Sequence, residues 1–180
     1  VHAPFNLRKA IIKLIQQEKA MALEGKPTRI IGKMNALTDP AVIKEFYEAS
    51  QAGVQIDLIV RGTCCLKPGI ANVSKNIRVI SVVGRFLEHS RVYHFLNAEH
   101  SVYCSSADLM ERNLSNRIEV CFPILKKKHA NRIIEELKVY LESPTQTWEL
   151  NATGEYIERL RQENDQLDVQ NELLNKLAQT

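Results

Sequence analysis

Long amphipathic segments alternate with short segments rich in β-branched residues in the N-terminal part of the chain. Residues 4–24 carry apolar side chains at helical spacing and end before Gly25, and Asp39 begins a second helical segment. Residues 29–34 and 54–60 are short and apolar, with the β-branched residues that strands favour. Alternation of this kind predicts a sheet covered by helices.

The middle of the chain is dominated by predicted strands. Residues 77–83 form one of them, residues 91–96 and 101–104 form a hairpin, and residues 118–124 form another strand. Residues 128–142 have the spacing of an amphipathic helix. We therefore expect an α/β (α+β) fold, in which helices flank a mixed β-sheet.

The composition of the chain changes towards its C-terminus. From Tyr156 the sequence is rich in Glu, Gln and Asn, with leucines spaced along it. This pattern predicts a peripheral amphipathic helix that packs on a domain outside this sequence, and a frayed, solvated helix is the alternative. We therefore divide the chain into a domain at 1–150 and a helical tail at 151–180. Because the chain begins at Val1 without a Met, we expect it to be a piece of a longer polypeptide.

The overall composition is that of an ordinary soluble domain, with 44% hydrophobic and 25% charged residues in 180 positions. The net charge of +3 and the pI near 8.7 suit an anionic ligand. Both values are too small to indicate nucleic acid, which we do not expect as a partner.

The four cysteines form no C-x-x-C pattern, so we expect neither a metal site nor a disulfide framework. The sequence contains no signal-peptide pattern and no apolar run that approaches the length of about 18 residues typical of a membrane span. We therefore expect a cytoplasmic protein, and peripheral association with a membrane stays open.

His89 and Arg91 are the first candidates for chemistry. They lie two residues apart, where a turn containing Gly84 leads into a predicted strand, so an extended backbone would place them on one face. Arginine offers a planar fork of donors to a phosphate, and histidine transfers protons near neutral pH. An H-x-R tripeptide is common, however, and a surface histidine beside an ion pair with Glu88 is the alternative interpretation.

A second segment, Ser105-Ser106-Ala107-Asp108, follows the predicted hairpin. Its presence makes a functional role of the H-x-R tripeptide more credible. Together the two segments resemble a variant of the phospholipase D superfamily pattern, which is H-x-K followed by G-S-x-N at the end of the next strand. Arg91 replaces the lysine, Ser105 the glycine and Asp108 the asparagine, and the superfamily's aspartate after H-x-K has no match. These departures argue against a standard phosphodiesterase. They favour a phosphate-binding pocket built on the same fold. For Asp108 itself we prefer a helix cap over a role in orienting His89 or Arg91.

Several longer motifs occur in a fixed order around these segments. They resemble the C-terminal part of the polyphosphate kinases that use a phosphohistidine, and the resemblance runs from about residue 4 to residue 150. The motifs are Lys33-Met34-Asn35, Gln51-Ala52-Gly53-Val54, Leu58-Ile59-Val60-Arg61-Gly62, Cys64-Cys65-Leu66-Lys67-Pro68-Gly69, Gly84-Arg85-Phe86-Leu87-Glu88-His89-Ser90-Arg91, Ser105-Ser106-Ala107-Asp108 and Asn116-Arg117-Ile118-Glu119-Val120.

The resemblance implies an enzyme that reversibly transfers the terminal phosphate of ATP to a polyphosphate chain with the help of Mg²⁺. In this family the active site lies between two phospholipase D-like C-terminal domains, and this chain resembles the second. The phosphorylated histidine belongs to the first, so we expect it and the Mg²⁺ ligands outside this sequence, and the fragment alone to be inactive. The implied partners are ATP or ADP, polyphosphate, the remaining domains of the enzyme and further copies in a homo-oligomer.

The resemblance also assigns individual residues. His89 matches the family's second active-site histidine, which contacts ATP and acts as a general acid or base. Arg61 matches an arginine that binds ATP phosphates, and its place directly after a predicted strand suits a ligand site at a sheet edge. Arg117 resembles another arginine of the phosphate pocket. We expect Arg91, from the H-x-R tripeptide, to bind phosphate in the same pocket. Further residues that could face this pocket are Lys33, Asn35 and Arg85.

Two other functions stay open from the sequence. One is a phospholipase D-like phosphodiesterase or nuclease, although such enzymes need two H-x-K units and one altered copy is present. The other is a non-catalytic module for polyanion binding or assembly, which the leucine-bearing tail supports. Lys126-Lys127-Lys128 fits a solvated entry to a helix and could also attract a polyanion.

Overall fold

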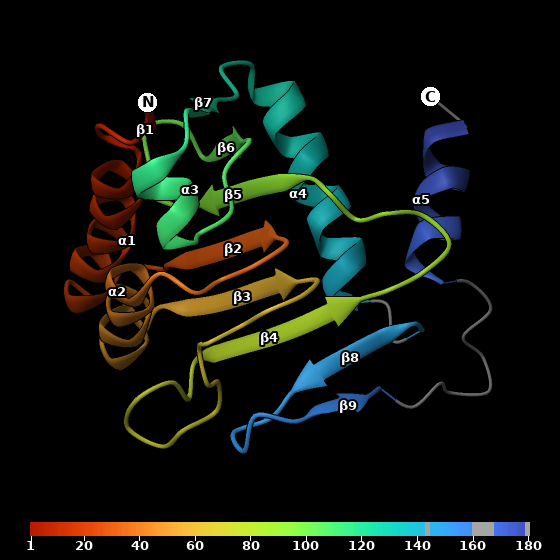
Figure 1. Cartoon of the computed structure of the whole chain (residues 1–180), viewed down its shortest axis with the longest axis horizontal. Coiled ribbons are helices and arrows are strands. Elements are labelled where there is room, and N and C mark those ends of the chain that lie inside the picture. Colours follow the sequence, from red (N-terminus) through yellow and green to blue (C-terminus); the bar gives the residue numbers. More distant parts are fainter. Residues whose placement is uncertain (143–144, 160–167, 179–180) are drawn as a thin grey trace.

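The computed structural model describes residues 1–142, 145–159 and 168–178. Its described strands form one mixed sheet in the order β1-β7-β6-β5-β2-β3-β4-β8-β9 (Figure 1). The strands are β1 (His2–Ala3), β2 (Arg29–Met34), β3 (Gln55–Val60), β4 (Ile77–Val82), β5 (Arg91–Phe95), β6 (Val102–Ser105), β7 (Glu119–Pro123), β8 (Thr147–Leu150) and β9 (Tyr156–Glu158).

The centre of the sheet is parallel and its two sides are antiparallel. Strands β2, β3 and β4 run in the same direction, with Gly32 of β2 beside Leu58 of β3 and Leu58 beside Val79 of β4. β5 pairs antiparallel with β2, and β8 pairs antiparallel with β4. Five of the six residues of β3 are buried, which explains why this segment is mostly apolar, although it includes Asp57.

Helices cover both faces of the sheet (Figure 1). Helices α1 (Leu7–Leu23) and α2 (Pro40–Gln51) share one hydrophobic core with Ile30 of β2, whereas α4 (Lys127–Glu142) and α5 (Val169–Ala178) share a second core with Ile31. The neighbouring isoleucines point to opposite faces because side chains alternate along a strand. The short helix α3 (Glu111–Asn116) lies between β6 and β7 in the chain. These three layers confirm the expected fold class.

Most helix boundaries follow local signals. Asp39 caps α2, because its Oδ1 atom accepts hydrogen bonds from the backbone N–H groups of Ala41 and Val42, each at 3.1 Å, and Pro40 occupies the first helical position. This confirms the predicted start of the second helix. Among the described helices none is long and apolar enough to cross a membrane.

The C-terminal part differs from the expected continuous helix. Tyr156–Glu158 form β9, which pairs with the equally unexpected β8, and α5 begins only at Val169. Residues 160–167 of the predicted helix lie outside the described residues. The prediction of a helix from Tyr156 is therefore wrong for residues 156–158. The Glu- and Gln-rich composition gives no local sign that these residues have a strand partner.

Glu18 of α1 links this helix to the β5–β6 hairpin. Its side chain is fully buried and accepts hydrogen bonds from Asn97, through the backbone N–H group and the Nδ2 atom, and from the backbone N–H group of Arg29. A buried carboxylate without such donors would be costly, so these bonds fix the hairpin against α1.

We predict that Glu18→Ala lowers the free energy of unfolding by about 2–4 kcal/mol, because it removes the carboxylate that accepts hydrogen bonds from three partly buried donors. Urea unfolding of the chain measures this change. Glu24→Ala is the matched control, since Glu24 is an exposed glutamate just past the same helix that pairs with Lys26. Its effect should stay within about 0.5 kcal/mol, and equal effects of the two substitutions would contradict the linking role of Glu18.

Candidate functional site

One edge of the sheet carries a polar cleft of about 660 Å³. The C-terminal ends of β2, β3 and β6 meet there with the N-terminal ends of β5 and β7, because β5 and β7 run opposite to their neighbours. Ligands gather at such strand ends in open sheets. The polar and charged residues that line the cleft are Asn35, Arg61, Thr63, His89, Arg91, Ser106, Asp108, Arg112, Asn113, Arg117 and Glu119. The structure thus brings together all four site residues expected from the sequence.

Arg91 and Asp108, which both line the cleft, form a bidentate ion pair. Arg91 donates from Nε to Oδ1 at 3.2 Å and from Nη2 to Oδ2 at 2.9 Å. Asp108 Oδ1 also accepts from the backbone N–H groups of Asn35 and Ala36, at 2.7 and 3.3 Å. Burial alone would raise the pKa of Asp108, but these hydrogen bonds and the arginine charge outweigh it and hold the pKa below its ordinary value. Asp108 is therefore an anion that fixes Arg91.

This arrangement corrects the expectation that Asp108 caps a helix. Helix α3 begins at Glu111, its N-cap position is Met110, and no side chain caps it. The segment before Leu109 resembles a helix start locally, but the donors that surround the carboxylate come from β5 and from the end of β2. The alternative role, orienting Arg91, is the one the contacts support.

His89 lies just before β5 rather than within it, so the expected extended segment begins at Arg91. The side chain is exposed, and Arg91 holds it locally. Nη1 of Arg91 donates to the backbone oxygen of His89 at 2.9 Å and lies 3.0 Å from Nδ1 of the ring. A guanidinium group only donates, so Nδ1 acts as the acceptor, and the proton of the neutral ring belongs on Nε2. The ring can then offer an N–H donor to an anion.

Arg61 and Arg117 supply further positive charge to the cleft. Arg61 directly follows β3, and its Nε atom is buried without a hydrogen-bond partner. Gly62 lets the backbone approach closely, because its N–H group donates to the oxygen of Asn35 at 2.9 Å and a Cβ would lie 3.1 Å from that oxygen. Arg117 follows α3 and is exposed. The two guanidinium groups are therefore available to an anionic ligand.

Two asparagines add acceptors to the cleft. The Oδ1 atoms of Asn35 and Asn113 are buried and have no hydrogen-bond partner. Nδ2 of Asn113 donates to Oε1 of Glu119 at 2.8 Å, which leaves the amide oxygen for another donor. Unpaired buried acceptors are rare in proteins and often mark a place where a ligand or water completes the bond. The sequence predicted Asn35 as a residue that could face the pocket. It did not predict Asn113, because no local motif marks this residue.

Lys33 and Arg85, the other residues considered for the pocket, do not line it. Lys33 is buried and forms an ion pair with Glu88 at 2.8 Å, which removes Glu88 from any pairing with His89. Arg85 lies over the ring of Phe86, 5.4 Å from its centroid. Neither cation is therefore placed to contact a ligand in the cleft.

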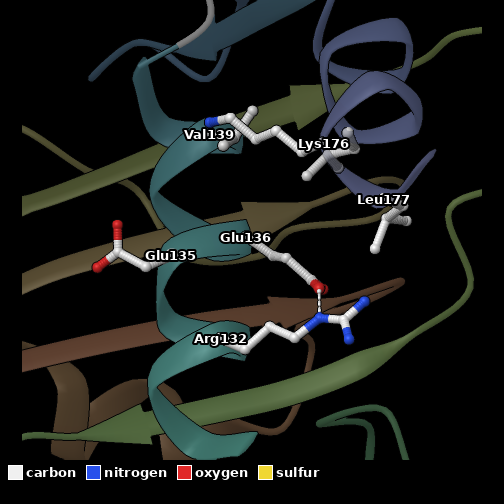
Figure 2. A pocket seen from close by; sticks show the side chains of 7 residues that line it. Arg132, Glu135, Glu136, Val139, Lys176 and Leu177 are labelled. Atoms are coloured by element: carbon white, nitrogen blue, oxygen red, sulfur yellow. Dashed lines mark hydrogen bonds and ion pairs between the residues drawn. The ribbon is translucent and has the colours of Figure 1, made fainter. Parts of the chain in front are cut away.

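Other features offer less for an anionic ligand. A smaller cavity of about 160 Å³ is lined by residues of α4 and α5. Arg132 pairs there with Glu136 at 3.2 Å, and the lining side chains carry charges of both signs (Figure 2). Among the described residues, no group of three or more His, Cys, Asp and Glu side chains is arranged to hold a metal ion.

The fold of the chain is phospholipase D-like. A phospholipase D family member, Nuc from Salmonella typhimurium, matches with a TM-score of 0.61 and 16% identity over 83% of this chain and 95% of that one. NucT from Helicobacter pylori matches with a TM-score of 0.58 and 13% identity, over 79% of this chain and 94% of that one. At these identities the likeness concerns the fold, and it confirms the phospholipase D-like sheet expected from the sequence.

Sequence comparison defines the family more narrowly. Residues 1–170 match the family model described as polyphosphate kinase C-terminal domain 2, and the chain belongs to this family. A polyphosphate kinase from Pseudomonas aeruginosa is 53% identical over 99% of this chain and 26% of its own length, and one from Bacillus cereus is 48% identical over 98% and 25%. The crystal structure of polyphosphate kinase from Porphyromonas gingivalis has a TM-score of 0.94 and 38% identity, over 99% of this chain and 28% of that one. The chain thus spans about a quarter of the length of these relatives.

We predict that Asp108→Asn destabilises the chain by about 3 kcal/mol near pH 7, because it leaves the buried guanidinium of Arg91 without an anion. The pKa of Asp108 is lower in the folded state, so its stabilising contribution is present above the unfolded pKa and is lost as the pH falls through the folded pKa. The difference between wild type and variant should therefore shrink from pH 5 towards about pH 2. Unfolding free energies measured across this range test it. Glu99→Gln, an exposed control, should give no such convergence.

Proposed function

We propose that this chain is the second phospholipase D-like catalytic domain of a polyphosphate kinase, an enzyme that reversibly transfers the terminal phosphate of ATP to a polyphosphate chain. The observation that carries this proposal is the cleft, in which four arginines and a histidine lie together at one sheet edge. The chain that forms this cleft is 53% identical to a polyphosphate kinase over 99% of its residues. The remaining domains of the longer protein are its partners, and ATP or ADP and polyphosphate are its ligands. We further propose a cytoplasmic homo-oligomer.

Phosphoryl transfer depends on positioning and on positive charge around the moving group. Arg61 and Arg117, whose guanidinium groups are not engaged by a carboxylate in the cleft, bind the phosphates of the nucleotide or the polyphosphate end. Arg91 is already held by Asp108, so it adds charge and orients His89. His89 donates a hydrogen bond from Nε2 to a phosphate oxygen of ATP. To act as the general acid or base that the family resemblance implies, the ring must release the contact of Nδ1 with Arg91, so that it can take up a proton there.

The residue that becomes phosphorylated belongs to another domain in this proposal. A histidine attacks phosphorus with a ring nitrogen that carries a lone pair, and in His89 the Nδ1 lone pair already faces Arg91. Mg²⁺ neutralises charge on the transferred phosphate when bound, and we expect its ligands in the remaining domains. This chain itself contributes guanidinium charge around the phosphates.

We predict that the chain binds ATP or tripolyphosphate, and that the Arg61→Ala, His89→Ala double substitution weakens binding roughly tenfold to a hundredfold, because two charge-assisted hydrogen bonds are lost. Isothermal titration calorimetry measures both affinities. Arg132→Ala is the matched control, since Arg132 is an arginine on α4 outside the cleft. Equal affinities of the wild-type chain and the double variant would sink the assignment of the pocket.

We also predict that the 180-residue chain alone makes no detectable polyphosphate from ATP, because its phosphorylated histidine is supplied by another domain. Robust turnover by the chain would contradict this. An assay with bis-p-nitrophenyl phosphate separates the phosphodiesterase alternative. Hydrolysis that disappears in His89→Ala would favour a phospholipase D-like phosphodiesterase over a phosphotransferase.

A further inference from the structure

The segment that carries His89 has no regular secondary structure. Residues 84–90 connect β4 to β5 and form neither helix nor strand. The backbone of such a segment lacks the bonds that a sheet supplies, so the position of His89 depends on contacts from other elements. Those contacts come from α5, from β2 and from α4.

Gln170, in the first turn of α5, binds the backbone of Phe86 much as a neighbouring strand would. Its Oε1 atom accepts from the N–H group of Phe86 and its Nε2 atom donates to the oxygen of Phe86, both at 2.8 Å. Nε2 also donates to Oε1 of Glu88 at 2.8 Å. Gly84 leaves room for this side chain, since a Cβ there would lie 2.6 Å from Oε1 of Gln170. A glutamine with only 5% of its surface exposed is thus fully engaged with the segment 84–90.

Glu88 and Ser90, the residues on either side of His89, are held by one buried ammonium group. Lys33 of β2 lies 2.8 Å from Oε2 of Glu88 and donates to Oγ of Ser90 at 2.7 Å. The hydroxyl of Tyr140 on α4 donates to the same Glu88 oxygen at 2.9 Å. Burial would raise the pKa of Glu88, but the hydrogen bonds it accepts, led by that from Lys33, hold the pKa below its ordinary value. Both neighbours of the histidine are therefore fixed.

Core packing determines where Gln170 lies. The preceding residue, Val169, is fully buried in the core beneath α4, and Leu173 packs against the same core one turn later. Helices α4 and α5 lie side by side (Figure 2). The amide of Gln170 is therefore presented to Phe86 by a helix anchored in the hydrophobic core rather than by a free tail.

We propose that Gln170 is a positioning residue for the phosphate site: through Phe86 and Glu88 it holds the segment 84–90 so that His89 meets the ligand in the cleft. The inference rests on the proposed function and extends it to α5. Residues that support a substrate-contacting side chain set its geometry. Their substitution lowers activity although they touch no ligand themselves.

The test uses the full-length protein that carries this domain, with the substitution Gln170→Met. Methionine keeps the length of the side chain and removes every hydrogen bond. We expect kcat/KM for ATP to fall roughly tenfold, because a displaced active-site group commonly costs that much or more. Asn175→Leu, at an exposed asparagine of the same helix, is the control and should leave kcat/KM unchanged.

A double-mutant cycle with His89→Ala separates positioning from general stabilisation. It is measured on ATP affinity by calorimetry, which stays measurable when turnover is lost. If Gln170 acts through His89, Gln170→Met weakens ATP binding in the wild-type background and adds nothing in the His89→Ala background. The same additional loss in both backgrounds would overturn the positioning role.

Hydrogen exchange gives an independent readout. Amide protons of residues 84–90 should exchange faster in Gln170→Met, and also in Gly84→Ala, which pushes the glutamine away. Unchanged exchange in both variants would contradict the inference. Unchanged ATP affinity of His89→Ala would overturn the proposed function of the histidine itself. A loss in His89→Ala with none in Gln170→Met would overturn only the role of Gln170.

Discussion

The site depends on one buried carboxylate, that of Asp108. Its donors come from two separate parts of the chain: the guanidinium of Arg91 at the start of β5, and the backbone N–H groups of Asn35 and Ala36 after β2. Both side chains are largely buried: 12% of the Arg91 side chain and 9% of the Asp108 side chain are exposed. If the ion pair were broken, each charge would be left with neither a partner nor full hydration, which is costly. This requirement fixes the ends of β2 and β5 relative to each other. The rest of the cleft follows from it, because Arg91 holds His89 and Asn35 holds the turn after Arg61.

Sequence signals predicted most elements and four residues that the structure brings together at the cleft, but they did not predict the contacts that these residues make. Helix starts such as Asp39 and the apolar strand β3 depend on neighbouring residues and could be predicted, and His89, Arg61, Arg91 and Arg117 were found through family motifs rather than from spacing alone. Asp108 was misjudged because a cap needs only its neighbours, whereas its actual partners lie 17 and 73 residues away. The strands β8 and β9 were missed for the same reason, since strand pairing is a contact between distant parts of the chain.

The cations in and beneath the cleft differ in their partners, which the net charge alone does not reveal. Lys33 and Arg91 are largely buried, and each is neutralised by a carboxylate, so they build the site. Arg61 and Arg117 lie at the cleft without such a partner there, so they are available to a polyanion. A chain with a net charge of only +3 can therefore present a cleft with an excess of positive charge, because arginines outnumber carboxylates among the lining residues. The amide oxygens of Asn35 and Asn113 then give that cleft acceptors as well as donors.

The state of the His89 ring follows from this difference. Because Arg91 is held by Asp108, its remaining N–H group faces Nδ1, and the neutral ring then carries its proton on Nε2. A ring in this state donates a hydrogen bond to a phosphate oxygen, but it has no free lone pair with which to attack phosphorus. Nucleophilic transfer would require the opposite tautomer, in which an acceptor rather than a guanidinium faces Nδ1. The contact between Arg91 and Nδ1 therefore suits His89 to donate a hydrogen bond rather than to act as a nucleophile.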